Sequence, residues 1–376
     1  MNTNTEHLLP LYSHLSDNPA HIIVNDPIQM FHNWSLLDCI SFYNNQIASK
    51  IIHGATPFAC KVVLTVGSET ISERALTYFN AIIEYFSSTY KIPINNFYLS
   101  VDCLDCDTNR EIFNKYSIWN SNIIFTKTLQ ESQRQFQDEP VIDYTPRIKP
   151  YKFLFYNKAC REHRYALAYR MAQEGLTDSG IWSADWDLDL PNHSMYLYPI
   201  FMKGEKSNIQ HLFPKTLNYN YEYFKPDVAH IESTYFSIIT ESVYTTDHHG
   251  LPPGTVNLGV PGNIFITEKT WRTIMSYHPF ILVAPTNTLL ELKKLGFKTF
   301  TPWINESYDG EQDDQKRLQK IYSEIKRLSE LSDNKWKTLQ EEMLPILKHN
   351  RARLIKMISP EYYIHNPDKA VDLLRI

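Results

Sequence analysis

The chain has 376 residues, of which 43% are hydrophobic and 21% charged, and this composition is typical of a globular protein with roughly two domains. It shows no basic, apolar leader and no membrane-spanning run, and its five cysteines, an odd number, make no disulfide framework. The first 150 residues carry 10 Lys and Arg against 15 Asp and Glu, whereas a duplex-binding face usually has a basic excess. We therefore expect a cytoplasmic protein without a membrane span.

The amino-terminal part alternates between strand and helix patterns. Residues 61–67 read as an apolar strand and a turn, and residues 72–88 repeat apolar side chains at helical spacing. Residues 96–102 and 122–125 read as further strands. This alternation predicts a parallel α/β domain over residues 1–146.

A polar, proline-bearing connection at 138–150 separates this domain from a second one, which we place at 151–340. Residues 312–331 and 334–357 have amphipathic helical patterns, and Pro345 is expected to interrupt the second. We assign residues 341–376 to a carboxyl-terminal helical segment.

Two strands of the second domain end in polar residues. Residues 153–156 form an apolar run that ends at Asn157, and a helix is predicted from Arg161 onward. Arg161 and Arg164 are three residues apart on that helix, so both can reach one diphosphate. Glu241 follows the strand predicted at 235–240, where it can contact a sugar or order the neighbouring loop.

The segment 264–300 predicts three strands separated by two helices. Strands are expected at 264–266, 280–283 and 297–300. Thr267 stands where the first helix needs an N-cap, and either Thr286 or Asn287 can cap the second. In a parallel α/β sheet, ligands gather at the carboxyl ends of such strands.

The first turn after Thr267 contains Glu268, Lys269 and Thr270. A helix N-terminus presents free N–H groups and a positive dipole end, so a diphosphate can dock there and Lys269 adds a full charge. A phosphate repels a carboxylate, so Glu268 is better suited to accept hydrogen bonds from a ribose. These residues predict a site for a nucleotide diphosphate.

The sequence resembles the fucosyltransferase-like glycosyltransferases, in particular a branch common in phages and bacteria. The resemblance rests on four ordered blocks, TEKT, HPF, GFKTF and ESYD, at residues 267–270, 278–280, 296–300 and 306–309. The strand ending in Asn157 and the segment ending in Glu241 match two further blocks of that family. One departure is the turn at 284–286, which lacks the usual glycine.

The resemblance implies a GT-B fold, in which two Rossmann-like α/β domains face a cleft, and transfer of a sugar from a GDP- or UDP-sugar. The donor would bind the second domain through Asn157, Arg161, Arg164, Glu241 and residues 267–270. The family's inverting, metal-independent reaction needs a carboxylate base in the first domain. Residues at strand ends or loops that suit this role are Glu69, Asp26 and Asp102.

Three patterns imitate metal sites. Cys103 and Cys106 form a CxxC without a second pair, and His248 and His249 lack a third spaced ligand. The DxD pattern at 185–187 lies in a Trp-rich stretch beyond the predicted phosphate helix. We expect no metal cofactor.

The acceptor stays open between two chemical classes. The relatives of this branch suggest either a carbohydrate or small acceptor, or hydroxymethylated pyrimidines in DNA, in a bacterial or phage-infected cytoplasm. The acidic balance of the first 150 residues slightly favours the carbohydrate. A third alternative is a scaffold that binds a nucleotide and has lost the transfer reaction.

Overall fold

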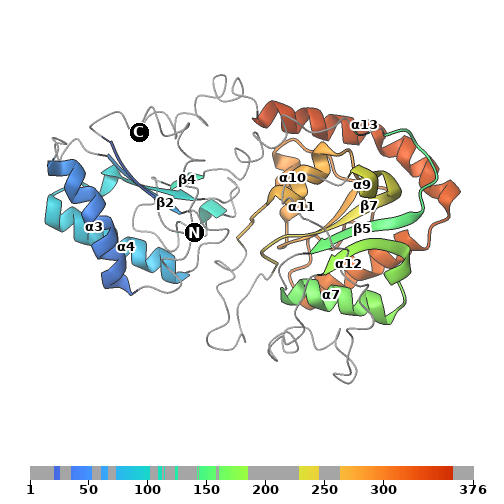
Figure 1. Cartoon of the computed structure of the whole chain (residues 1–376), viewed down its shortest axis with the longest axis horizontal. Helices are drawn as coiled ribbons and strands as arrows, with labels where there is room; N and C mark the ends of the chain where they lie inside the picture. Colours follow the sequence, from blue (N-terminus) through green and yellow to red (C-terminus); the bar gives the residue numbers. More distant parts are fainter. Residues whose placement is uncertain are drawn as a thin grey trace. The chain divides into compact units, whose positions relative to one another are not determined.

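The structure is a computed structural model, and it forms two compact units (Figure 1). The first comprises Met1–Glu131, Asn257–Phe265 and Ser359–Ile376, and the second Ser132–Val256 and Ile266–Ile358. The structure describes residues 21–25, 35–52, 61–66, 73–101, 109–111, 114, 123–125, 142, 144–157, 161–184, 228–244 and 263–358.

The first unit contains a parallel sheet with the strand order β1-β2-β3-β4. Its strands are β1 (His21–Asn25), β2 (Lys61–Val66), β3 (Phe97–Val101) and β4 (Ile123–Phe125), and its helices are α3 (Leu36–Ile52), α4 (Glu73–Tyr90) and the 3₁₀ turn η2 (Ile94–Asn96). The last three strands and α4 confirm the pattern read from the sequence. Helix α3 begins with a capping box, because Ser35 and Asp38 each accept a hydrogen bond from the backbone N–H of the other.

The second unit contains another parallel sheet, with the order β6-β5-β7-β8. Its strands are β5 (Tyr151–Asn157), β6 (Gly180–Ala184), β7 (Thr234–Thr240) and β8 (Phe280–Val283). Its helices are α7 (Glu162–Gln173), η3 (Thr177–Ser179), α9 (Val228–Ser233), α10 (Glu268–Met275), α11 (Thr288–Lys294), α12 (Asp314–Ser329) and α13 (Asp333–Ile358).

Helices cover both faces of this second sheet. Figure 1 shows α9, α10 and α13 over one face and α7 with α12 over the other. Strands buried on both faces need apolar side chains throughout, and every residue of β7 and β8 is buried. The chain is therefore a mixed α/β protein with parallel sheets, and in its described residues no helix is long and apolar enough to cross a membrane.

Two of the expected strands are wrong. Residues 264–266 are buried, and so are residues 297–300 apart from the exposed Lys298. Neither run pairs with a strand among the described residues, and side chains bond to their backbone groups instead. The amide of Asn109 binds both N–H and C=O of Ile264, and the amide of Asn350 does the same for Lys298. A side-chain amide offers the donor and acceptor that a neighbouring strand otherwise supplies.

Helix α13 runs through Pro345 without the expected interruption, and the boundary predicted at 340 falls inside it. Its carboxyl-terminal half serves as a set of caps for other helices. Arg351 donates to the carbonyl of Met275, the last residue of α10, at 3.1 Å. Arg353 donates to Leu295 at 2.7 Å, and His349 bonds to the Gly296 carbonyl, so the end of α11 is held as well.

We expect Asn350→Ala to lower the free energy of unfolding by about 1 to 3 kcal/mol, because the partly buried backbone N–H and C=O of Lys298 both lose their side-chain partner. Chemical denaturation measures this effect. Asn334→Ala, at an exposed position on the same helix, is the matched control and should change stability by less than about 0.5 kcal/mol. Equal losses in both variants would contradict the role given to Asn350.

A buried lysine makes stability depend on pH. The ammonium of Lys149 donates to the carbonyls of Ile231 and Thr234, and burial lowers the pKa of Lys149 to about 7. The unfolded chain, with an ordinary lysine pKa, then binds more protons than the native one above pH 7, so stability rises with pH. From pH 7 to 9 the rise is about 2 kcal/mol. Lys149→Met should abolish that rise, as urea denaturation at both pH values would show.

Candidate functional site

The carboxyl ends of β5 and β7 lie side by side at the point where the strand order reverses. From β5 the chain crosses to β6 on one side, and from β7 it continues to β8 on the other. Such a switch point in a parallel sheet is the usual place for a ligand. Asn157 ends β5, Thr240 ends β7, and the Thr240 hydroxyl donates to Asn157 Oδ1 at 2.6 Å.

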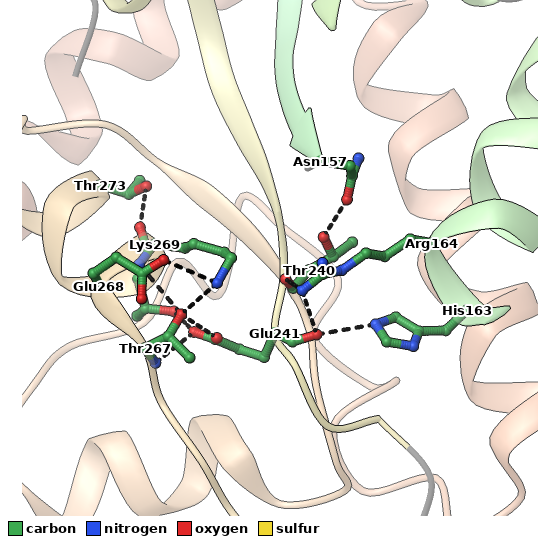
Figure 2. A network of polar contacts seen from close by, with 10 residues as sticks. Asn157, His163, Arg164, Thr240, Glu241, Thr267, Glu268, Lys269 and Thr273 are labelled. Carbon is green, nitrogen blue, oxygen red and sulfur yellow. Dashed lines mark hydrogen bonds and ion pairs between the residues drawn. The ribbon is translucent and has the colours of Figure 1, made fainter. Parts of the chain in front are cut away.

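Glu241 follows Thr240 and is completely buried (Figure 2). Its carboxylate accepts three hydrogen bonds, two from the backbone N–H and hydroxyl of Thr267, at 3.1 and 2.6 Å, and one from the hydroxyl of Thr270, at 2.5 Å. Burial raises the pKa of the Glu241 carboxyl, although the charge of Lys269 and these hydroxyls oppose the rise. Of the two roles predicted for Glu241, these contacts correspond to ordering the neighbouring loop.

The backbone carbonyl of Glu241 is held from the opposite side by α7. Arg164, which is 2% exposed, donates from one terminal nitrogen to the carbonyls of Thr240 and Glu241, at 3.0 and 3.1 Å. His163 Nε2 bonds to the Glu241 carbonyl at 3.0 Å, and its ring stacks on Tyr244. Burial, with the nearby charge of Arg164, holds the pKa of His163 well below its usual value, so the imidazole is neutral and donates.

Helix α10 begins as the sequence predicts. Thr267 is the N-cap and its hydroxyl accepts from the backbone N–H of Lys269 at 3.3 Å. The Lys269 ammonium donates to that same hydroxyl and to Glu268, both at 3.0 Å. Burial alone raises the pKa of the Glu268 carboxyl, but the adjacent Lys269 and the charge of Arg272 outweigh it, and the pKa is lowered. Glu268 is therefore ionised at neutral pH.

A small cavity lies between α10 and the face of the sheet formed by β5 and β7. It measures about 30 Å³, and Lys269 and Arg272 line it together with Tyr156, Thr240 and Thr273. Among its described lining residues two are basic and none is acidic. Arg272 was missed at the sequence level, although its spacing of three residues from Lys269 places both on one face of α10.

The structure thus gathers most of the predicted donor residues at one edge of the sheet. Arg161 occupies the N-cap position of α7, three residues before Arg164, and both charges act on His163. Arg164 itself bonds to backbone carbonyls, which sequence reasoning did not foresee. Asn157 is 2% exposed, and its Nδ2 has no hydrogen-bond partner among the described residues.

The remaining motif residues hold loops together. Glu306 accepts from the hydroxyls of Thr299 and Thr301 and from the backbone N–H of Phe300. Asp309 accepts from the backbone N–H groups of Leu289 and Leu290, so it caps α11 across about twenty residues of sequence. The sequence analysis expected Thr286 or Asn287 to cap α11, and this is right for the position of Asn287 but wrong for the hydrogen bond. Asn287 stands at the N-cap, but its side chain accepts no capping bond.

Several predicted sites lie outside the described residues. These are the three base residues Glu69, Asp26 and Asp102, and the metal-like patterns at 103–106, 185–189 and 246–250. Within the part of the chain that the structure describes, no group of three or more His, Cys, Asp or Glu side chains is placed to hold a metal ion.

In chemical terms, the described site offers positive charge and hydrogen-bond donors in a largely buried setting. Lys269 and Arg272 supply two cations, the N-terminus of α10 supplies the positive end of the helix dipole, and Asn157 supplies an amide. This combination suits an anion with several oxygens, such as a diphosphate. In comparisons with known proteins, no protein-family model and no curated sequence matches the chain.

We expect Arg164→Met to destabilise the ligand-free protein by about 1 to 3 kcal/mol, because the buried carbonyl of Thr240 loses its side-chain donor and that of Glu241 keeps only His163. Thermal and urea unfolding measure this without any ligand. Lys337→Met, an exposed position on α13, is the control and should behave as the wild type. A variant as stable as the wild type would leave Arg164 with a role in ligand binding alone.

Proposed function

We propose that the chain is a glycosyltransferase that moves a sugar from a nucleotide-diphosphate donor to an acceptor hydroxyl, with inversion and without a metal ion. The observation that carries the proposal is the convergence of Asn157, Thr240 and the N-terminus of α10 at the switch point of a parallel sheet. The resemblance to fucosyltransferase-like enzymes, on the TEKT block above all, gives the reaction class.

The diphosphate is assigned to Lys269, Arg272 and the first turn of α10. Both cations line the cavity between α10 and the sheet, and the lowered pKa of Glu268 keeps a carboxylate beside them. A carboxylate that is ionised accepts hydrogen bonds, so Glu268 is assigned to hydroxyls of the ribose. In this proposal the nucleotide is GDP or UDP.

In the reaction, the acceptor oxygen bonds to the anomeric carbon of the sugar while the bond from that carbon to the diphosphate oxygen breaks. The electron pair of the broken bond leaves with the diphosphate, and the proton of the acceptor passes to a carboxylate base. Negative charge grows on the departing oxygens in the transition state. Fixed cations at Lys269 and Arg272 stabilise that charge more than they stabilise the bound donor, which accelerates the reaction.

In this proposal the two units have the roles of the donor and acceptor domains of a GT-B enzyme. The second unit binds the donor, and the first binds a carbohydrate or small acceptor and contributes Glu69, Asp26 or Asp102 as the base. Transfer to hydroxymethylated DNA is the alternative for the acceptor. A gel shift on hydroxymethylated duplex at two salt concentrations separates the two, because binding to DNA phosphates weakens steeply with salt.

We expect one nucleoside diphosphate among GDP, UDP and TDP to raise the melting temperature of the wild type, with CMP as a comparison. At about a thousand times its dissociation constant a ligand adds roughly 4 kcal/mol of stability. Lys269→Ala and Arg272→Met should each weaken binding about 10- to 100-fold in calorimetric titration, because each removes a charged hydrogen bond.

The exposed Lys337→Ala is the matched control for these variants and should bind like the wild type. Failure of every nucleotide to bind the wild type would overturn the proposal. Binding without release of the diphosphate from any donor sugar would instead identify a scaffold that has lost the transfer reaction.

A further inference from the structure

The buried carboxylate of Glu241 contacts the N-cap and the first turn of α10. It accepts from the backbone N–H of Thr267 through one oxygen and from the hydroxyl of Thr267 through the other, and Thr270 adds a third bond. Glu241 and both threonines are at most 1% exposed, so water does not compete for these bonds. The carboxylate therefore fixes both the backbone and the side chain of the N-cap.

The Thr267 hydroxyl accepts from two donors, the backbone N–H and the ammonium of Lys269, at 3.3 and 3.0 Å. These donors take its two lone pairs, so its proton must point at Glu241, whose carboxylate oxygen accepts it. The position of the Lys269 ammonium thus depends on the Thr267 hydroxyl, whose proton is directed at Glu241.

Residues of α7 fix the position of the Glu241 backbone. Arg164 and His163 hold the Glu241 carbonyl from the opposite side, and Figure 2 shows Glu241 between these residues and the N-terminus of α10. Arg164 also holds the carbonyl of Thr240, the last residue of β7. The strand end is therefore anchored, and the carboxylate can transmit its position to α10.

We propose that Glu241 is a positioning residue that aims the Lys269 ammonium at the ligand through the hydroxyl of Thr267, and that it touches no ligand itself. This inference rests on the proposed function, in which Lys269 binds the donor diphosphate. Of the two roles considered for Glu241, contact with a sugar or ordering of the neighbouring loop, the proposal adopts the second.

A double-mutant cycle tests the proposal. In Glu241→Gln one side-chain oxygen becomes a donor, and in either orientation of the amide that donor faces a group of Thr267 that already donates. We expect Glu241→Gln to weaken GDP or UDP, whichever the wild type binds, about 10-fold in calorimetric titration. In the Lys269→Ala background the same substitution should have no further effect. An equal loss in both backgrounds would overturn the proposal.

Three further variants control for a general loss of folding or binding. Glu291→Gln removes another buried carboxylate, 3% exposed, on α11, and should bind the nucleotide like the wild type. If Glu241→Gln does not fold, Thr267→Val removes the same relay without touching Glu241, and Thr267→Ser restores the hydroxyl. We expect Thr267→Val to lose about 10-fold in affinity and Thr267→Ser to lose none; equal affinities would contradict the relay.

A measurement without ligand separates failure of this inference from failure of the proposed function. Amide hydrogen exchange of residues 266–271 should be faster in Glu241→Gln than in the wild type, and unchanged in Glu291→Gln, because the amide disturbs the bonds that hold the N–H of Thr267 and, through the Thr267 hydroxyl, the N–H of Lys269. Unchanged exchange in Glu241→Gln would overturn the positioning role. Faster exchange in a protein that binds no nucleotide would overturn the proposed function alone.

Discussion

The edge of the second sheet depends on one residue that is bonded from both sides. The carboxylate of Glu241 holds α10 and its carbonyl is held by α7, so two helices that lie on opposite faces of the sheet meet at the end of β7. The N-terminus of α10 is capped by Thr267, which Glu241 holds in place without a ligand. Preorganisation of this kind lowers the entropy that a ligand loses on binding, because the groups that contact it are already in place.

Local sequence patterns were sufficient for the elements that form the site. The apolar runs at β5, β7 and β8 and the N-cap at Thr267 are encoded within a few residues, so they could be predicted and were confirmed. The role of Arg164 could not, because it depends on carbonyls more than seventy residues further along the chain. Spacing indicates which side chains share a helix face, and it does not indicate what that face meets.

The two wrong strands have a common physical cause. Strand prediction assumes that an apolar, β-branched run satisfies its backbone through a neighbouring strand. In this fold Asn109 and Asn350, distant in sequence, supply both the donor and the acceptor instead. The N-terminus of α11 is likewise capped by a residue distant in sequence, because Asp309 accepts the hydrogen bond that a residue next to the helix was expected to accept. Apolar pattern predicts burial well, and the identity of the hydrogen-bond partner is a tertiary property.

The continuity of α13 has a consequence for any shortened form of the protein. The arginines that close the ends of α10 and α11 lie beyond residue 340, in the part that local sequence suggested was a separate appendage. A chain cut at that point would keep every residue of the anion site and lose the supports at the far ends of the helices beneath it. The residues that form the site and those that hold the ends of its neighbouring helices thus lie in different parts of the sequence, and removal of the second group would weaken the first.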